Sequence, residues 1–261
     1  MLYCARAIYF WREDQVKVSK LFFLAVLSTT LAGCSIDVDA LVEAMNAAQS
    51  QEKNLPTYDL PEDEFARAMD EHLNYLILVN NKHPYDFSGV YNQELQKDLA
   101  CVADDLVGEA TPIEKGALYA FTLLRYDLLQ KGMEIGLYNA YRTYEDQEET
   151  RRLFPETTVE PGFSEHHTGL VLDIMIKWVD ENGEKTWFTE TVERQAKIPE
   201  FKIVHETLAD YGFIDRYPPG KEAYTGLPSM PYEIRFVGSS KVAHEIMDNN
   251  LCLEEYLEKN E

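Results

Sequence analysis

The spacing of hydrophobic and polar residues along the chain predicts strands and helices that do not alternate regularly. Short apolar runs typical of strands occupy residues 75–79, 135–140, 169–176 and 233–237. Helical periodicity marks residues 112–131, 143–154, 199–210 and 240–248, and a further helix is expected to begin near Pro61. Mixed elements in this order predict an α+β fold.

The clearest predicted helix start is a capping box. Thr111 and Glu114 have the spacing at which each side chain bonds the other residue's backbone N–H, and Pro112 lies at the first helical position. Gly132 is expected to end this helix, and Gly212 to end the helix at 199–210. Residues 179–185 are expected to form a loop.

The N-terminal segment has the pattern of an export signal. An apolar run of twelve residues, Leu21 to Ala32, follows Lys17 and Lys20 and ends at Gly33-Cys34. Twelve residues are too few to cross a bilayer, whereas a basic flank, a short apolar core and small residues are typical of a signal peptide. The ending Leu-Ala-Gly-Cys resembles the lipobox of bacterial lipoproteins, which implies a lipid on Cys34. A buried core helix that ends in Gly-Cys is the alternative.

This pattern predicts the organisation of the chain. Residues 1–33 are expected to be a lipoprotein signal peptide, 34–60 an acidic tether and 61–261 the folded domain. Acidic residues among the first fifteen positions are unusual in a signal peptide, which suggests a true start near Val16 or Val18. We expect the mature protein on the extracellular face of the bacterial cytoplasmic membrane, anchored by lipid.

Charge and cysteine content narrow the classes of partner. Against 46 Asp and Glu, the chain has 24 Lys and Arg, which gives a net charge of −22. Because nucleic-acid binding needs a basic surface, we expect no such partner. The sequence predicts no oligomeric state, and a monomer is taken by default. Four cysteines are too few for a disulfide scaffold, and pairing of Cys101 with Cys252 stays open.

The densest group of potential metal ligands lies between His166 and Asp173. If residues 169–176 form a strand, Asp173 can face the side from which a loop carries His166. An imidazole nitrogen and a carboxylate oxygen suit zinc, but two ligands alone do not make a site. A hydrogen-bonded His–Asp pair is the alternative.

Four segments carry a resemblance to a known family: Tyr141 to Gln147, Pro161 to Asp173, Tyr211 to Pro218 and Thr225 to Gly238. In order and spacing they resemble the VanY-type D-alanyl-D-alanine carboxypeptidases, zinc peptidases that trim bacterial cell-wall peptides. The family patterns are close to Gly-Tyr-Arg-Ser, Ser-Glu-His-x-x-Gly-x-x-x-Asp and Glu-Pro-Trp-His-x-Arg-Tyr-Val-Gly. The resemblance runs from about Leu78 to Leu257. It implies a small antiparallel sheet flanked by helices, as in zinc D-Ala-D-Ala peptidases and hedgehog-like domains.

The resemblance also implies roles for individual residues. His166 and Asp173 correspond to the first two zinc ligands. Arg142 corresponds to the cation that grips the substrate's terminal carboxylate or the developing oxyanion, which a guanidinium can do with two bonds at once. Ser164 and Gln147 correspond to residues that position the substrate. From the residues alone, Arg142 could also form a surface salt bridge, Ser164 could belong to a turn, and Gln147 could be an exposed helix residue.

The last motif departs from the family pattern. Met230 occupies the general-base position, and Glu233 occupies the position of the third zinc ligand. A carboxylate can bind zinc, although two anionic ligands weaken the ion as a Lewis acid. A thioether accepts no proton, and loss of the base commonly removes about 10²–10⁴-fold of the rate. Glu165 and His167 are near enough in sequence to be replacement bases.

Two interpretations therefore stay open. One is a zinc-dependent carboxypeptidase that removes the terminal D-Ala of peptidoglycan stem peptides with a remodelled last motif. The other is a catalytically silent relative that binds wall peptides through Arg142 and Ser164. An enzyme with altered specificity for another peptide bond is a weaker third interpretation.

Overall fold

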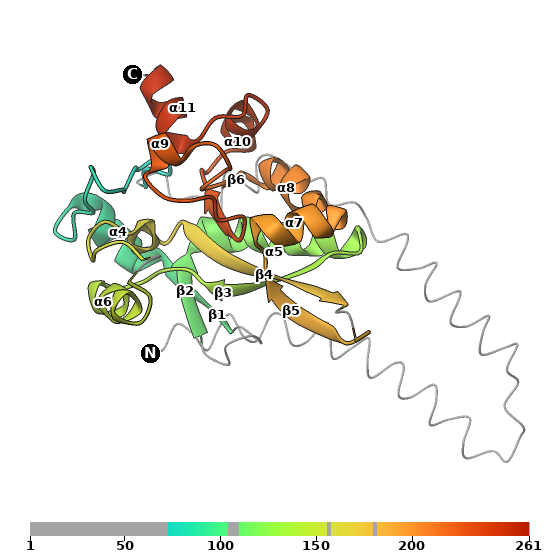
Figure 1. Ribbon diagram of the computed structural model, residues 1–261. Helices are drawn as coiled ribbons and strands as arrows, with labels where there is room; N and C mark the ends of the chain where they lie inside the picture. Colours follow the sequence, from blue (N-terminus) through green and yellow to red (C-terminus); the bar gives the residue numbers. More distant parts are fainter. Residues whose placement is uncertain (1–72, 104–109, 156–157, 180–181, 261) are drawn as a thin grey trace, which may run out of the picture. The chain divides into compact units, whose positions relative to one another are not determined.

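An antiparallel sheet of five strands organises the part of the chain that a computed structural model describes, residues 73–103, 110–155, 158–179 and 182–260 (Figure 1). The strand order is β3-β4-β7-β6, and β5 also pairs with β4. The strands are β3 (Glu134–Asn139), β4 (Val171–Val179), β5 (Lys185–Thr189), β6 (Phe213–Asp215) and β7 (Glu233–Phe236). A separate two-stranded sheet pairs β1 (Leu99–Ala103) with β2 (Ala110–Glu114).

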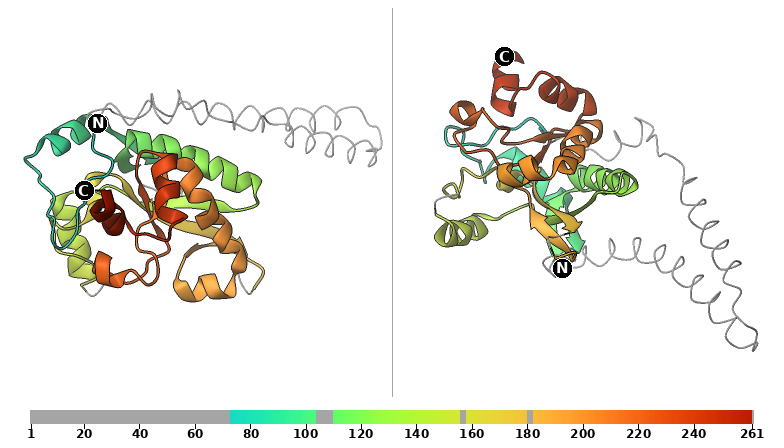
Figure 2. Two further views of the ribbon diagram at one scale, coloured as in Figure 1. Left: turned by 90° about the horizontal axis from the view of Figure 1, so that it is seen from above. Right: turned by 45° about the vertical axis from the view of Figure 1, so that its right-hand side comes forward.

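Helices and short 3₁₀ turns connect and flank these strands. The helices are α4 (Val90–Asp98), α5 (Lys115–Gln130), α6 (Tyr144–Leu153), α7 (Val192–Lys197), α8 (Lys202–Leu208), α9 (Glu222–Thr225), α10 (Ser240–Met247) and α11 (Leu253–Asn260). The 3₁₀ turns are η1 (Glu165–Thr168), η2 (Pro199–Phe201) and η3 (Ala209–Tyr211). The C-terminal helices, drawn in red, gather at one end of the described domain near β6 (Figures 1 and 2).

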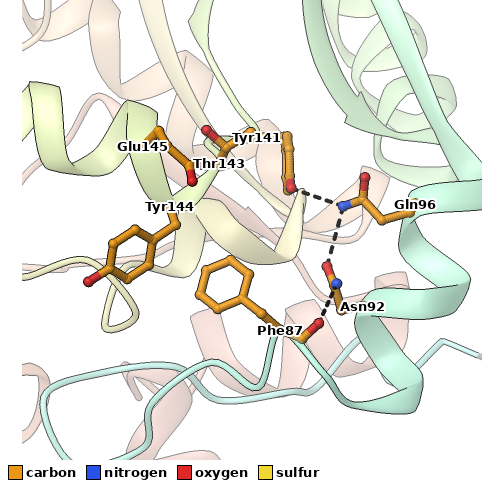
Figure 3. A pocket seen from close by; sticks show the side chains of 7 residues that line it. All are labelled: Phe87, Asn92, Gln96, Tyr141, Thr143, Tyr144 and Glu145. Atoms are coloured by element: carbon orange, nitrogen blue, oxygen red, sulfur yellow. Dashed lines mark hydrogen bonds between the residues drawn. The ribbon is translucent and has the colours of Figure 1, made fainter.

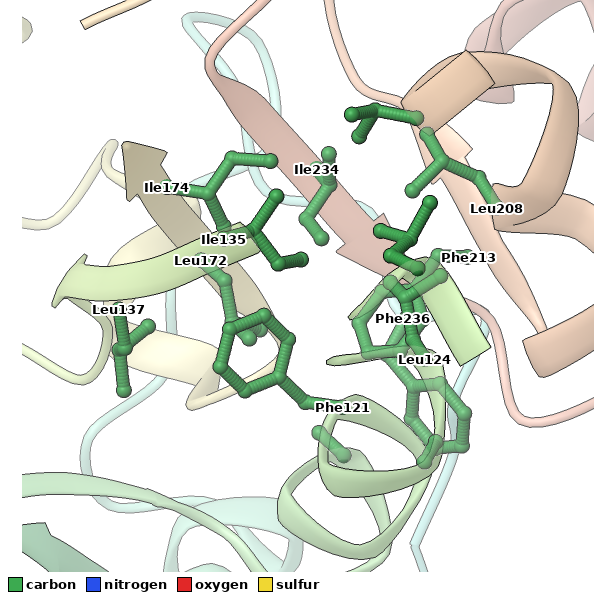
Figure 4. Close-up of a cluster of buried hydrophobic side chains, with 14 of the residues drawn as sticks. Phe121, Leu124, Ile135, Leu137, Leu172, Ile174, Leu208, Phe213, Ile234 and Phe236 are labelled. Atoms are coloured by element: carbon green, nitrogen blue, oxygen red, sulfur yellow. The ribbon is translucent and has the colours of Figure 1, made fainter. Parts of the chain in front are cut away.

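The main hydrophobic core fills the space between the sheet and α5. Because side chains alternate along a strand, Leu172, Ile174 and Ile176 of β4 all face this core, opposite cross-strand neighbours on β3 and β7. Phe121 and Leu124 of α5 approach from the other side (Figure 4). Burial of each such side chain stabilises the fold by about 1.5–3 kcal/mol. The opposite face of the same strands is therefore free to carry polar groups.

The helix predicted from Thr111 begins later than the capping box indicates. Residues up to Glu114 instead form β2, and the Glu114 N–H donates to the carbonyl of Gly169 at 3.1 Å. Glu114 becomes the N-cap of α5, because its carboxylate accepts from the backbone N–H groups of Gly116 and Ala117. Pairing with β1 thus overrides the local signal for an earlier helix start.

The run Tyr75 to Val79 was predicted as a strand, and this prediction is wrong. The buried Arg235 guanidinium donates to the carbonyls of Tyr75 and Ile77, which a neighbouring strand would otherwise bind. The run is apolar throughout because its residues pack in two directions. Tyr75 and Ile77 contact the main core, while Leu76 and Leu78 contact a second cluster beside α10.

Other boundaries follow the sequence more closely. The predicted strand at 169–176 begins at Val171, after Gly169 in the left-handed conformation, and continues to Val179. Because β5 begins at Lys185 and pairs with β4, both ends of the predicted 179–185 loop belong to strands, and the connection is shorter than predicted. The helix predicted at 143–154 is confirmed as α6. The helix predicted at 199–210 is divided into η2, α8 and η3, and Gly212 follows it in the left-handed conformation. The predictions for Cys34, for residues 1–60 and for the helix near Pro61 lie outside the described residues.

The structure also bears on the pairing of Cys252 and on membrane-spanning helices. Cys252 is a free thiol inside the fold, so it forms no disulfide with Cys101, and burial raises its pKa to about 11. No helix in the described part of the chain combines the length and apolar character needed to cross a bilayer.

A charged cluster away from the main core joins α8, β6 and the end of β5. His205 lies between two carboxylates, with Nδ1 2.5 Å from Asp215 Oδ1 and Nε2 2.9 Å from Glu190 Oε2. Burial alone lowers the pKa of His205, but Asp215 and Glu190 raise it to about 10. The imidazole is therefore protonated at neutral pH and donates from both nitrogens.

We expect His205→Gln to lower the free energy of unfolding by about 3 kcal/mol at pH 6, because the buried Glu190 and the partly buried Asp215 lose their cation. The folded-state pKa of His205 lies above its unfolded value, so its contribution is complete below about pH 6.5 and is lost as the pH rises towards 10. Urea unfolding of both proteins at pH 6 and pH 9.5 should show the difference shrinking. His244→Gln, at an exposed pair with Asp210, is the control. A difference of equal size at both pH values contradicts the assignment.

Candidate metal centre and active site

His166 is held with one ring nitrogen turned into the polar face of the sheet. It lies in the η1 turn, and its Nδ1 is 2.5 Å from the carbonyl oxygen of Ala140. Since a carbonyl only accepts, Nδ1 is the donor in this bond, and Nε2 is the nitrogen that a neutral imidazole offers to a metal. Such a backbone partner is the usual way in which a protein fixes the orientation of a histidine ligand.

Asp173 and Glu233 meet His166 at this point. They are directly opposite each other on β4 and β7, so their side chains project from the same face of the sheet. The His166 Nε2 atom is 3.6 Å from Asp173 Oδ2 and 3.8 Å from Glu233 Oε1, and one ligand atom from each residue lies within 4.8 Å of the others. Tetrahedral zinc ligands are about 3.3 Å apart, so only a small adjustment separates this arrangement from a coordination shell.

The bonding of Asp173 shows that the group fits a cation. Its Oδ2 accepts from Asn139 Nδ2 at 3.1 Å and from Arg142 Nη2 at 2.9 Å. Its Oδ1 is buried and has no hydrogen-bond partner among the described residues. A buried carboxylate oxygen without a partner is costly, and a metal ion satisfies it.

Glu233 adds to this excess of negative charge. Burial raises the pKa of Glu233 well above its usual value, and the charge of Asp173 raises it further. Burial also raises the pKa of Asp173, but His166, Arg142 and Asn139 outweigh this and leave it below its ordinary value. Two buried carboxylates share one small space, and a divalent cation there would compensate both.

Arg142 reaches the same group of residues from the segment before α6, where its guanidinium bonds Asp173. Its Nη1 donates to Gln147 Oε1 at 3.2 Å, and Gln147 Nε2 donates to the carbonyl of Val159 at 2.9 Å. The fully buried Gln147 thus holds the guanidinium in place, with both ends of its amide bound inside the protein. Among the described residues, Gln147 and Asp173 each accept from one of the five N–H groups of Arg142, which leaves donors for a carboxylate or an oxyanion.

Comparisons with known proteins identify the family. The model of the VanY family, described as D-alanyl-D-alanine carboxypeptidase, matches residues 111–239. The solved structure of the LdcB LD-carboxypeptidase, reported for its peptidoglycan recognition, is 31% identical with a TM-score of 0.57, over 71% of this chain and 86% of that chain. The chain is a member of the VanY family. It therefore carries a domain of the carboxypeptidase type, and the family resemblance found in the sequence is confirmed.

Two further proteins are similar to this chain. A vancomycin-resistance D,D-pentapeptidase VanY variant, solved in complex with Zn(II), is 25% identical with a TM-score of 0.52, over 70% of this chain and 98% of that chain. A Bacillus subtilis protein with the name "Putative carboxypeptidase YodJ" is 36% identical over 139 residues, which are 50% of this chain and 48% of that protein. The match thus spans about half the length of YodJ. The predicted small antiparallel sheet flanked by helices is confirmed.

Met230 marks where this VanY-family chain departs from the family pattern. It is largely buried in the turn before β7, and the Glu233 N–H donates to its carbonyl at 3.1 Å. The Tyr232 hydroxyl donates to Met230 Sδ at 3.2 Å. A phenol and a thioether therefore fill the position where the family pattern has a carboxylate, and neither is ionised near neutral pH. Burial raises the pKa of Tyr232 further.

Glu165 is not available as a replacement base. Its side chain is buried, with one oxygen bonded to the guanidinium of Arg216 and the other 3.5 Å from Arg235 Nε. Both oxygens of this carboxylate are thus engaged by arginine side chains in the protein interior. Arg216 also donates to Glu254 of α11 at 2.8 and 3.1 Å.

His167 is not available as a base either. Its Nδ1 lies 2.8 Å from the carbonyl of Arg142, and its Nε2 accepts from the Gly162 N–H at 3.0 Å. Both ring nitrogens are thus bound to backbone groups, and burial lowers its pKa. His167 fixes the backbone of Arg142 instead of receiving a proton from substrate or water.

Ser164 lies buried immediately before the η1 turn, and its carbonyl accepts from the His167 N–H at 3.2 Å. Its hydroxyl makes no hydrogen bond within the described ranges, so contact with a substrate stays a prediction. Gln147 is not the exposed helix residue considered from the sequence alone.

Sequence reasoning missed Asn139, which bonds Asp173. Regular alternation from Ile135 and Leu137 places residue 139 on the core face. A bulge between Leu137 and Asn139 moves it to the opposite face, beside Asp173. No sequence signal marks this bulge.

We expect Glu165→Gln to lower the free energy of unfolding by about 3–5 kcal/mol, because it leaves Arg216 and Arg235 without their shared carboxylate. Chemical denaturation at pH 7 measures this loss. Glu149→Gln, which breaks an exposed pair with Arg152, should leave the transition unchanged. If Glu165→Gln keeps full stability yet abolishes hydrolysis, Glu165 acts in the chemistry and the structural role is wrong.

Proposed function

We propose that this domain is a zinc-dependent carboxypeptidase that removes the terminal D-Ala from peptidoglycan stem peptides. The observation that carries the proposal is the convergence of His166, Asp173 and Glu233 on one point, with the Arg142 guanidinium bonded to Asp173 beside them. Membership of the VanY family and the zinc complex of a relative support it. One imidazole and two carboxylates are all accepted zinc ligands.

Zinc bound by these three side chains would polarise the scissile carbonyl and promote attack by water. The protein's own groups supply the positioning. The guanidinium of Arg142 binds the terminal carboxylate or the developing oxyanion. Gln147 holds that guanidinium, and His167 bonds the backbone carbonyl of Arg142. The buried Asp173 is shared between the metal group and Arg142, so the cation site and the substrate-binding cation are fixed together.

The two changes in the last motif predict slow turnover. A second anionic ligand, Glu233, makes the ion a weaker Lewis acid, and Met230 cannot take the proton of the attacking water. The replacement bases suggested by the sequence are bound elsewhere. Binding of wall peptides without hydrolysis is the outcome that an activity measurement must separate from slow hydrolysis.

We also propose that the domain is anchored to the extracellular face of the bacterial cytoplasmic membrane through lipid on Cys34. The order of basic residues, short apolar core and Leu-Ala-Gly-Cys supports this proposal. Mass spectrometry of the mature N-terminus should find Cys34 as a lipid-bearing first residue. Cys34→Ala should move the protein from the membrane fraction. Unchanged membrane retention of this variant contradicts the proposal.

We expect the double variant Met230→Glu with Glu233→His to release D-Ala from a D-Ala-D-Ala-ended peptide about 10²–10⁴-fold faster than the native chain, because it restores a proton acceptor and a neutral third ligand. Single-turnover kinetics with zinc present measure the change. Each single variant should gain much less. Met230→Glu alone places a further carboxylate near Asp173 and Glu233, where it can trap a proton.

The controls separate loss of metal from loss of chemistry. His166→Ala should bind less zinc and show no zinc-dependent rise in thermal midpoint, whatever its activity. Zinc binding by the native chain without any release of D-Ala, even in the double variant, would support a silent relative. Rapid native turnover that the double variant does not increase would show that another residue supplies the base.

A further inference from the structure

The metal group, which consists of His166, Asp173 and Glu233, offers a cation more oxygen atoms than nitrogen atoms. His166 contributes only Nε2, because its Nδ1 is bonded to the carbonyl of Ala140. Asp173 contributes Oδ1, which is buried and has no hydrogen-bond partner among the described residues. The carboxylate of Glu233 faces His166 Nε2 at 3.8 Å and accepts no hydrogen bond from any residue in the described ranges. One nitrogen and several carboxylate oxygens are therefore available to an ion.

Glu233 is the source of this excess of oxygen. The family pattern has histidine at this position, which would give the group a second imidazole. Glu233 lies directly opposite Asp173 in the pairing of β4 with β7, so a side chain at position 233 projects from the same face of the sheet as Asp173. Exchange of this single residue thus changes the ligand atoms without moving the site.

The neighbouring side chains do not replace the missing nitrogen. The Met230 sulfur, which would favour a soft ion, accepts from the Tyr232 hydroxyl at 3.2 Å. The Gln147 amide is bonded at both ends, to Arg142 and to the carbonyl of Val159. In the part of the chain that the structure describes, no further histidine or cysteine joins the metal group. The ligand atoms are therefore one nitrogen and carboxylate oxygens.

The charge of the metal group attracts any divalent cation. Asp173 and Glu233 are both buried, and among the described residues the guanidinium of Arg142 donates to Asp173 and Gln147. With both carboxylates ionised, one arginine leaves one negative charge uncompensated. This charge does not distinguish between divalent ions, whereas the kind of ligand atom does, because imidazole suits zinc and carboxylate oxygen suits manganese. Since zinc binds most sites more tightly than manganese, the ligand atoms set the size of its advantage.

We propose that the metal group accepts Mn²⁺ in place of Zn²⁺, because Glu233 supplies carboxylate oxygens where the family pattern supplies an imidazole nitrogen. Zinc stays the tighter of the two ions, but its advantage over manganese is smaller in this chain than it would be with histidine at position 233. This inference rests on the proposed function, because it concerns the ion that the carboxypeptidase carries. The relative supply of the two metals then decides which of them occupies the site.

A competition titration tests this proposal. A chelator first removes metal from the native chain. Mn²⁺ is then added at about pH 7, the free ion is measured by electron paramagnetic resonance, and Zn²⁺ is added to displace the bound ion. The ratio of the manganese Kd to the zinc Kd should rise about tenfold in Glu233→His, because an imidazole nitrogen favours zinc. Glu233→Gln keeps an oxygen ligand but loses its charge, so both ions should bind more weakly, at a ratio within about threefold of the native one.

Matched controls separate the metal group from the other acids of this chain, whose net charge is −22. Glu145 lines a separate cavity of about 490 Å³ beside α4 and the start of α6, whose lining includes none of the three proposed ligands (Figure 3). Glu145→Gln should leave both Kd values unchanged, whereas His166→Ala should weaken binding of both ions. Equal thermal midpoints of the metal-free proteins show that the variants are folded. The native titration needs no variant, since a manganese Kd above about 1 mM contradicts the proposal.

Release of D-Ala from a D-Ala-D-Ala-ended peptide distinguishes this inference from the proposed function. If the native chain binds Mn²⁺ and Glu233→His raises the ratio of the two Kd values, but neither ion supports release of D-Ala, the proposed function fails and the metal preference stands. If the zinc-loaded native chain releases D-Ala while Glu233→His keeps the native ratio, the metal preference is wrong and the proposed function stands.

Discussion

The carboxylate of Glu165, buried between the guanidinium groups of Arg216 and Arg235, joins the parts of the domain that carry the site. Arg235 also binds the carbonyls of Tyr75 and Ile77, and Arg216 binds Glu254 of the last helix. Glu254 in turn accepts from Asn80 at 3.2 Å. Segments from both ends of the described chain are thus bound to one buried ionic group. Because charges without partners are so costly in the interior, these segments must assemble together.

The same ionic group fixes the proposed metal ligands. Glu165 precedes His166 directly, and Arg235 lies two residues after Glu233 on β7. A shift of the η1 turn or of β7 that separates the ligands would therefore also separate Glu165 from Arg235. The Ala140 carbonyl and the Asn139 amide then set the final orientation of His166 and Asp173. These contacts together organise the polar face of the sheet around the three proposed ligands.

The sequence predicted the fold best where local pattern and tertiary environment agree. The apolar run that contains Leu172, Ile174 and Ile176 identified the central strand, and these three residues do face the core. The prediction failed where groups distant in the sequence determine the conformation of the backbone. Thr111 has a capping sequence but pairs in β2, while the working capping box joins Thr143 and Asp146. The carbonyls of Tyr75 and Ile77 bind an arginine 158 to 160 positions away, which no local pattern records. The spacing of the motifs was enough to predict His166, Asp173 and Arg142 as site residues. The position of Asn139 depends on a bulge, which the sequence does not show. The roles of Glu165 and His167 depend on the residues that they contact in the folded chain.

Side chains along β7 alternate between the polar face and the core, so the residues for catalysis and those for folding can change independently in evolution. Glu233 projects to the polar face, whereas its neighbours Ile234 and Phe236 fill the core. Exchange of a ligand or of the base in the preceding turn therefore leaves the packing that holds the domain together intact. A lineage can lose, weaken or regain hydrolysis through one or two replacements while selection on solubility and expression sees no change. Stability alone is then a poor guide to which members of such a family are still active enzymes.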